Sequence, residues 1–540
     1  MVRSDIQRVE ALLREARQHG YSRRELVRRA AAIGVAIPAA GLVIGGPASA
    51  GAQGAEPSGK IVLSMSVEPD SLENWRSYST DGHPILRNVQ EALLNRDPET
   101  NELVGELATS WEQTNDVTWR FHLREGVTFH NGEAFNADVA AFGINYTWSP
   151  ENNFQIYQYV GPDMNATAID EYTVDVVTEA PDPILPSRLY FSPLPSMQQV
   201  TEAPETLPDN PIGTGPYIFQ EWNRGQYMRA VANPDWWGHT ADDALGQISI
   251  QEAEWVFRAE SAVRAAMVVA EEAQFARFLS PEDCETTPQC ITSSSVETIF
   301  LRLDTMHPVM SDIRIRKAIG LSINKEAVAE QLFGGGEPAS QLVGPSATGY
   351  NAELDPYPFD MEQATQLVEE AAADGVPIDM PITVATREGI YVRNAEFAEY
   401  VANQLNEIGL NAHSEVIEIA LYNEQYDVNY NDVPEDRGWI GTNPHGNEIM
   451  DVSSTVQAYY SCEGGSSTYC DPELDEAFNA AAPLTGEARQ EAFEEITRMY
   501  YEDYGAVPII HMPLNYGLAA NLVWEARLDG FILLKEMSFT

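Results

Sequence analysis

The chain has 540 residues, of which 82 are acidic and 32 are Lys or Arg, and its formal net charge at pH 7 is −50. Such an acidic surface repels nucleic acid and anionic membranes, so no nucleic-acid partner is expected. Hydrophobic residues make up 44% of the chain, which is enough for packed cores. The length predicts two or more domains.

The first fifty residues differ from the rest of the chain. The basic segment SRRELVR at residues 22–28 precedes an apolar run, and the small residues at 48–50 form a typical cleavage site. The run is interrupted by Pro38 and is too short for a membrane span, which needs about 20 apolar residues. We predict an export signal over residues 1–50 that resembles the twin-arginine type. A retained anchor helix is the alternative. Export places the protein in the periplasm or on the outer face of the cytoplasmic membrane.

The acidic residues are spread along the whole chain, and only four Lys occur. This composition resembles that of halophilic proteins, in which salt shortens the range of charge repulsion. Ordinary acidity with Arg used in place of Lys is the alternative. Because like charges resist association, we expect a monomer.

Four cysteines form two local pairs, Cys284 with Cys290 and Cys462 with Cys470. An even number of cysteines in an exported chain predicts disulfides, although four cysteines allow three connectivities. A zinc site is the alternative, but neither pair has CxxC spacing and no His lies near either pair in the sequence.

Strand-like and helix-like segments alternate in the first part of the chain. Alternating apolar residues indicate strands, and apolar residues three or four apart indicate helices. We predict strands at residues 60–69, 118–129, 173–180 and 216–222, and helices at residues 83–97 and 134–148.

The second part of the chain has stronger helix boundaries. Residues 313–336 predict two helices that meet at Ile323-Asn324. Asp360 and Gln363 form a capping pattern at the start of the next helix, and Gly375 lies just past its end. A strand over residues 381–389 and a helix that ends at Gly409 follow. This alternation predicts an α/β lobe with a mainly parallel sheet.

The segment RGWIGTNPHGNEIMD, residues 437–451, is rich in residues that interrupt regular structure. Gly438, Gly441, Pro444 and Gly446 predict a series of turns whose backbone groups are free to bind something. The segment contains no known catalytic signature, and neither does the rest of the chain, where GxSxG, HExxH, P-loop and GxGxxG patterns are absent. A secreted hydrolase with unrelated spacing stays open as an alternative.

Several segments together resemble one protein family. Residues 106–146 are similar to the signature segment of the substrate-binding proteins of ABC importers in the dipeptide, oligopeptide and nickel group, which is family 5 of the solute-binding proteins. Similar segments follow in the family's order at residues 68–75, 212–222, 312–328, 357–371 and 506–514.

The resemblance implies an α/β bilobed periplasmic-binding-protein fold of type II, with an extra subdomain in the first lobe. The strands that cross between the lobes would lie near residues 298–305 and 506–512. The implied division is an export signal at 1–50, lobe I at 51–85, 212–300 and 507–540, the extra subdomain at 86–211, and lobe II at 301–506.

The resemblance also implies a ligand site in the cleft between the lobes. In the dipeptide-binding members an Arg holds the peptide carboxylate, and Arg387 stands at that place; a guanidinium binds a carboxylate through two hydrogen bonds. His445 stands where the family has an Asp that pairs with the peptide amine, so Glu448 or Asp451 would have to replace it. The predicted ligand residues are Arg387, Trp439, Gly441, Asn443, His445 and Glu448.

Each of these residues has a plainer interpretation. Trp439 is equally suited to core packing, His445 to capping a turn, and Arg387 to a surface ion pair. The resemblance implies a solute receptor that delivers its ligand to an ABC permease, with no cofactor and no catalytic residue. The ligand is expected to be a peptide. An oligosaccharide, or a metal or metallophore held by His445 with Glu448, is the alternative.

Overall fold

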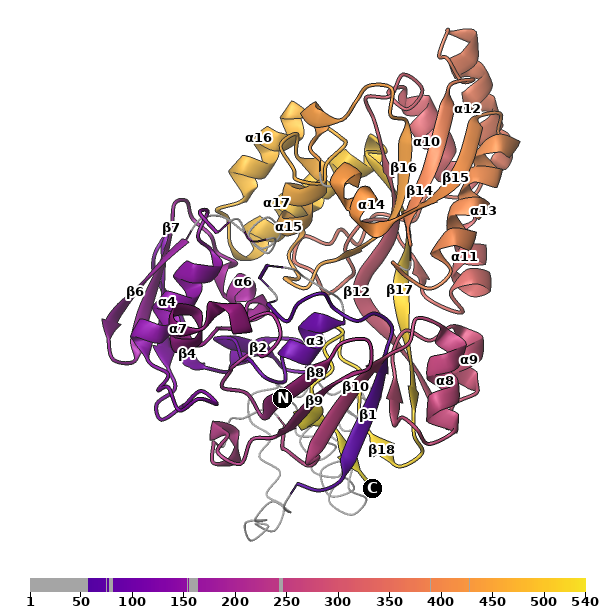
Figure 1. The fold of residues 1–540 in the computed structure, drawn as a ribbon. Coiled ribbons are helices and arrows are strands. Elements are labelled where there is room, and N and C mark those ends of the chain that lie inside the picture. Colours follow the sequence, from indigo (N-terminus) through magenta and orange to yellow (C-terminus); the bar gives the residue numbers. More distant parts are fainter. Residues whose placement is uncertain are drawn as a thin grey trace, which may run out of the picture. The chain divides into compact units, whose positions relative to one another are not determined.

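The largest sheet of the described residues is mixed and has 11 strands. Its order is β15-β14-β16-β12-β17-β11-β1-β10-β9-β8, and β13 pairs with β17 beside this path (Figure 1). The computed structural model describes residues 57–73, 75–76, 81–152, 154, 164–241, 246–388, 390–426 and 428–540. These residues belong to one compact unit, Pro57–Thr540. The predicted export signal lies outside the described residues.

Two long strands, β12 (Gln289–Leu303) and β17 (Ala506–Leu518), pair antiparallel at the centre of this sheet. The first part of β12 pairs with the last part of β17, and the register then shifts between Ser294 and Thr298. Such a bulge bends a strand and increases its twist. Figure 1 shows both strands running between the two groups of strands described below, which we call the first and the second lobe.

The first lobe contains the strands on the β1 side of the crossing strands. Ile61, Leu63 and Met65 of β1 are buried on the core face of the sheet, and Ser64 is buried on the opposite face. Its strands are β1 (Lys60–Met65), β8 (Tyr217–Asn223), β9 (Tyr227–Ala232), β10 (Glu252–Phe257), β11 (Phe275–Ala276), β18 (Leu522–Val523) and β19 (Ser538–Phe539). Its helices are α3 (Gly82–Leu86), η2 (Trp237–His239), α8 (Ser261–Val269), α9 (Pro281–Glu285) and η5 (Leu534–Glu536).

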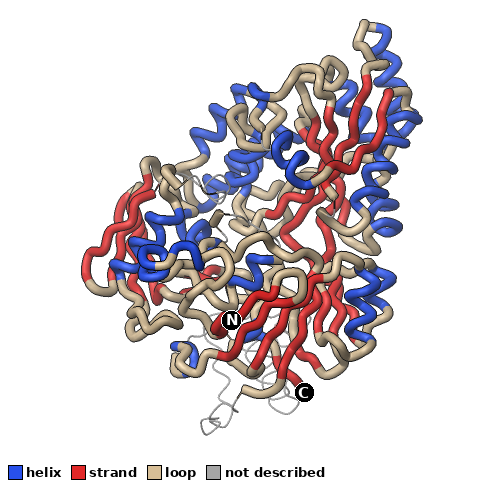
Figure 2. The backbone as a smooth tube through the Cα atoms, in the orientation of Figure 1, coloured by secondary structure: helices blue, strands red, loops and turns tan. Residues whose placement is uncertain are grey.

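A separate subdomain has its own antiparallel sheet of four strands, in the order β4-β5-β7-β6, and its own apolar cluster. In Figure 2 this sheet lies apart from the large one. Its strands are β2 (Leu94–Arg96), β3 (Leu103–Gly105), β4 (Ala108–Asn115), β5 (Thr118–Leu123), β6 (Met164–Asp170) and β7 (Thr173–Thr178). Its helices are α4 (Ala137–Thr147), α6 (Leu185–Phe191), α7 (Met197–Glu202) and η1 (Pro204–Thr206).

The second lobe continues the large sheet beyond β12, with helices packed on the strands (Figure 2). Its strands are β13 (Glu337–Pro338), β14 (Pro381–Arg387), β15 (Asn411–Ile417) and β16 (Trp439–Gly446). Its helices are α10 (Ile313–Ser322), α11 (Lys325–Leu332), α12 (Met361–Ala373), α13 (Asn394–Glu407), α14 (Ile419–Tyr426), η3 (Tyr430–Asp432), α15 (Val452–Thr455), the π-helical turn η4 (Val456–Tyr460), α16 (Pro472–Ala481) and α17 (Gly486–Glu502).

Capping residues set the helix boundaries of this lobe as the sequence predicts. Asn324 accepts a hydrogen bond from the amide of Ala327 at the start of α11, and Asp360 accepts one from Gln363 at the start of α12. Gly375 and Gly409 follow α12 and α13 with φ of +97° and +96°, a conformation that favours glycine.

One helix predicted in the first part of the chain was wrong. The helix predicted over residues 83–97 is only α3, which ends at Leu86; turns follow, and Leu94–Arg96 is strand β2. Pairing with β3 overrides the helical spacing there. Among its own strands the sheet of the second lobe is mainly parallel, as predicted. β14 pairs parallel with β15 and β16, whereas β16 pairs antiparallel with β12, the strand that enters this lobe from the first lobe.

Candidate ligand-binding site

The glycine-rich segment that was predicted to form turns is largely a strand, so that prediction was wrong. β16 occupies Trp439–Gly446 and pairs with β12 along its whole length. Of the three glycines in the segment, only Gly438 has a left-handed conformation, with φ of +54°. β14 pairs with β16 only as far as Gly441. Pro444, which has no backbone N–H, therefore interrupts no hydrogen bond with β14.

Arg387 lies at the carboxyl end of β14. The parallel register joins Ala385 to Gly441, so Arg387 is level with Asn443 on the neighbouring strand. Its Nη1 donates to Oδ1 of Asn423 on α14 at 3.2 Å. Its buried Nε has no hydrogen-bond partner among the described residues. The guanidinium therefore keeps a donor available at the end of the strand where parallel sheets place their ligands.

Asn443 and Gly441 meet Tyr422 of α14. The Tyr422 hydroxyl donates to the Asn443 side-chain oxygen. A Cβ on Gly441 would lie 3.3 Å from that hydroxyl, so the missing side chain leaves room for the contact. Burial raises the pKa of Tyr422, which keeps the hydroxyl protonated as the donor.

Trp439 is 8% exposed and stacks on Tyr422, with ring centroids 5.8 Å apart. Its amide donates to Asp304 at 2.9 Å. That carboxylate also receives two hydrogen bonds from Arg437. These contacts favour the packing interpretation of Trp439. A ligand contact by its indole stays a prediction.

His445 lies opposite Thr298 in the ladder between β16 and β12. Its Nε2 lies 2.7 Å from Oγ1 of Thr455, and that oxygen also accepts a hydrogen bond from Asn447. Burial lowers the pKa of His445 to about 4, so the imidazole is neutral at physiological pH. A neutral imidazole cannot replace the charge of an acidic residue beside an ammonium group.

A recess lies beside the bulge of β12, lined by Arg277 and Asp529 from the first lobe and by Glu297 and Glu448 from the crossing strand and the second lobe. Glu297 faces Gly446 across the ladder. A Cβ on Gly446 would lie 2.5 Å from Oε1 of Glu448, so the Glu448 carboxylate lies over Gly446. The two glutamates therefore meet at the same level of the sheet.

Electrostatics in the recess favour a positive ligand group. The Glu297 carboxylate accepts no hydrogen bond from another described residue. Burial and the nearby Glu448 raise the pKa of Glu297 to about 7. Arg277 is bonded to Asp81 at 3.2 Å, and Asp529 receives hydrogen bonds from Arg527. The arginine in the recess is therefore already bonded to a different carboxylate.

The structure groups only some of the predicted residues. Arg387, Gly441 and Asn443 lie at α14, whereas Glu448 lies in the recess. Asp451, the second candidate to replace the missing Asp, is buried in an ion pair with Arg489 and is not available to a ligand. The sequence reasoning missed Glu297. An acidic residue inside the apolar run VETIFL was the signal that could have found it.

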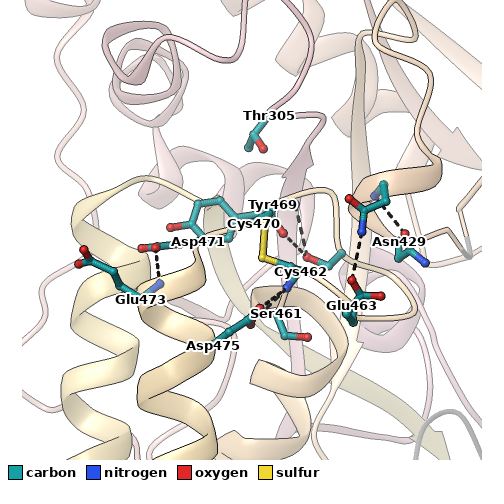
Figure 3. Close-up of a disulfide and its surroundings, with 12 residues drawn as sticks. Thr305, Asn429, Ser461, Cys462, Glu463, Tyr469, Cys470, Asp471, Glu473 and Asp475 are labelled. Atoms are coloured by element: carbon teal, nitrogen blue, oxygen red, sulfur yellow. Dashed lines mark hydrogen bonds between the residues drawn. A yellow bond between two sulfur atoms is a disulfide. The ribbon is translucent and has the colours of Figure 1, made fainter.

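Both cysteine pairs are disulfides, Cys284–Cys290 and Cys462–Cys470, and the four cysteines are therefore not zinc ligands. Figure 3 shows the second pair, where the amide of Cys462 donates to Asp475 at 3.2 Å. Thr305, at the end of the crossing strand, donates to the Thr468 carbonyl within this loop. The disulfide loop thus fixes the end of β12 against α16.

No helix in the part of the chain that the structure covers is long and apolar enough to cross a membrane. Among the same residues, no group of three or more His, Cys, Asp or Glu side chains is arranged to hold a metal ion.

Comparison with known proteins decides the family. The model of the bacterial extracellular solute-binding proteins, family 5, matches residues 102–462, which is well over half of the chain. The chain belongs to this family. It is a solute receptor of the ABC-importer type and not an enzyme.

Relatives of this family 5 receptor agree with its fold. The di/tripeptide-binding protein 2 of Pseudomonas aeruginosa is 25% identical, over 83% of this chain and 88% of its own length. The Helicobacter pylori protein DppA, solved with the peptide STSA, superposes with a TM-score of 0.77 at 19% identity, over 89% of this chain and 98% of its own. AgaA of A. tumefaciens R10, solved with agropinic acid, gives a TM-score of 0.75 at 17% identity, over 89% and 99%. These structures share the bilobed fold.

Proposed function

We propose that this receptor binds a short peptide between its two lobes and delivers it to the membrane permease of an ABC importer. A curated relative that binds di- and tripeptides and a structural neighbour that holds a tetrapeptide support this ligand class. The observation that carries the proposal is the pair Glu297 and Glu448 in the recess. A free peptide amine is a cation at neutral pH, and two adjacent carboxylates attract a cation.

Arg387 is the proposed partner of the peptide carboxylate. Arg387 is level with Asn443 on β16. Asn443 lies three residues before Gly446, and the Glu448 carboxylate lies over Gly446. Three residues of a strand span about 10 Å. An extended peptide of two or three residues has about that length. This spacing along the strand therefore supports a di- or tripeptide.

The amine end is tested by isothermal titration with a dipeptide, a tripeptide and their N-acetylated forms. Glu448→Gln should weaken binding of the free peptides at least about tenfold, because hydrogen bonds to charged groups contribute about 1.5–3 kcal/mol. N-acetylation should weaken binding to the wild type and have little further effect in the variant. Glu424→Gln changes an exposed acid on α14 and serves as the control. Equal affinities for free and acetylated peptides would contradict this assignment.

The carboxyl end is tested in the same way with C-terminal amides. Arg387→Ala should weaken binding of the peptide with a free carboxylate about tenfold or more, because the guanidinium recognises the carboxylate. The variant should bind this peptide and its C-terminal amide equally. If oligosaccharides, agropinic acid or divalent metals raise the melting temperature of the receptor and no peptide does, the peptide proposal is wrong and the stabilising solute is the ligand.

Cellular context completes the proposal. Residues 1–50 act as a twin-arginine type export signal, and the mature receptor works as a monomer outside the cytoplasmic membrane. Lobe I comprises residues 51–85, 212–300 and 507–540, the subdomain residues 86–211, and lobe II residues 301–506. Strands β2–β7, between residues 94 and 178, support the range of the subdomain. The excess of acidic residues supports adaptation to high salt.

A further inference from the structure

The segment Asn447–Asp451, which carries Glu448, is fixed to the second lobe and to the crossing strand. The Asp451 carboxylate receives hydrogen bonds from Nε and Nη2 of Arg489 on α17, at 2.8 and 2.7 Å, and both side chains are buried. The Asn447 side chain donates to the Asp451 carbonyl and accepts a hydrogen bond from the Asp451 amide. The amide of Asn447 donates to the Val296 carbonyl on β12. The segment must therefore move as part of the second lobe.

The same segment also contacts the subdomain of the first lobe. Arg96, at the end of β2, donates from Nη2 to the Ile449 carbonyl at 2.9 Å and from Nη1 to the Asn101 carbonyl at 2.9 Å. Its guanidinium lies over the Tyr190 ring at 4.9 Å and is buried. The Asn101 side chain donates to the Met450 sulfur.

The Ile449 side chain makes this contact apolar as well as polar. It is 5% exposed and belongs to the core cluster of the subdomain, whose other members come from residues 75–207 and from Phe531 and Leu533. Ile449 is thus a second-lobe residue buried in a first-lobe core. Met450 and Asn101, on the two sides of the contact, have φ of +60° and +63°. The left-handed conformation is strained for Met450, and such a residue persists only where surrounding contacts hold it.

We propose that Arg96, Asn101, Ile449 and Met450 form a clasp that exists only when the lobes are closed, and that Arg96 positions Glu448 for the ligand through it. This inference rests on the proposed function of the recess. Opening of the lobes would carry Ile449 into water and uncover Arg96. The burial of Ile449 therefore stabilises only the closed form. Because the ligand binds the closed form at Glu448, this burial also raises the affinity for the ligand.

The sharpest test is Ile449→Ala, measured by peptide affinity. Loss of a buried isoleucine from the closed form alone should weaken binding about tenfold or more, chiefly through faster dissociation. Arg96→Gln should weaken binding in the same sense. Ile144→Ala is the matched control, because Ile144 is equally buried in the same cluster but lies on α4 within the subdomain. It should lower the melting temperature and leave the affinity unchanged.

The outcomes separate this inference from the proposed function. A wild type that binds peptide, with Ile449→Ala binding it equally well, would overturn the clasp and leave the peptide proposal standing. A wild type that binds no peptide would contradict the proposed function instead. Small-angle X-ray scattering of the ligand-free protein then tests the clasp alone: Ile449→Ala should have a larger radius of gyration than the wild type and Ile144→Ala, and equal radii would overturn it.

Discussion

Glu297 and His445 show how burial acts with opposite sign on an acid and a base. Burial disfavours the charged form of either group, so the pKa of Glu297 rises to about 7 and that of His445 falls to about 4. Both groups lie on neighbouring strands near the recess. His445 is therefore neutral at pH 7, and negative charge for a ligand amine has to come from Glu448 and from Glu297, whose ionised form a nearby cation favours.

The pH dependence of stability tests the environment of Glu297. Its folded pKa of about 7 exceeds the ordinary value of 4.5. The folded state therefore binds more protons than the unfolded state between these two values, and stability falls as the pH rises through them. Glu297→Gln should remove this loss and stabilise the protein by about 2 kcal/mol at about pH 8, with little effect at about pH 4.

Chemical denaturation of wild type and Glu297→Gln at both pH values measures this difference. Glu424→Gln, at an exposed position, is the control and should follow the wild type at each pH. A stability difference between Glu297→Gln and wild type that is the same at both pH values would contradict the raised pKa.

β16 shows at the scale of one element why local sequence can mislead. Its glycines and proline have poor intrinsic strand preference, yet the segment pairs with β12 on one side and with β14 on the other. By contrast, the caps and glycine stops of α11, α12 and α13 depend on contacts within a few residues, and the sequence predicts them well. Tertiary pairing decided the strand, whereas local hydrogen bonds decided the helix ends.

Gly438→Ala tests the conformation that starts β16. Gly438 has φ of +54°, and a Cβ there would lie 2.9 Å from Nε2 of His307 and 3.0 Å from the Pro381 carbonyl oxygen. The substitution should destabilise the protein by about 1–3 kcal/mol, from backbone strain and from these contacts. Thermal and urea unfolding measure the change. Gly344→Ala is the control, because no atom lies within 4 Å of its Cβ position. Equal stability of the two variants would contradict a special role for Gly438.

At the scale of the whole molecule, charge is the dominant feature. Acidic residues outnumber Lys and Arg by 82 to 32, and two of the four lysines, Lys325 and Lys535, are buried. Most acidic side chains therefore have no basic residue available to pair with them. Their mutual repulsion destabilises the folded state and depends on screening by salt.

The melting temperature should accordingly rise by several degrees from low salt to molar NaCl, measured by differential scanning calorimetry. Screening by ions predicts that most of the rise occurs below about 0.5 M, where the Debye length has already fallen to a few ångströms. An uncharged osmolyte such as sucrose serves as the control for effects that do not involve charge. A melting temperature that is constant across the salt range would contradict adaptation to high salt.

The sequence by itself determined the family, the α/β class and the helix boundaries of the second lobe, because these depend on short-range patterns and on motifs that occur in a fixed order. It left the connectivity of the four cysteines open, and the structure decided it. Only the tertiary structure decided that β16 is a strand, that Trp439 packs in the core and that Glu297 meets Glu448. These features depend on pairing between segments more than 100 residues apart, such as Glu297 with Gly446. Distant segments come together through the fold as a whole, and no local pattern records that contact.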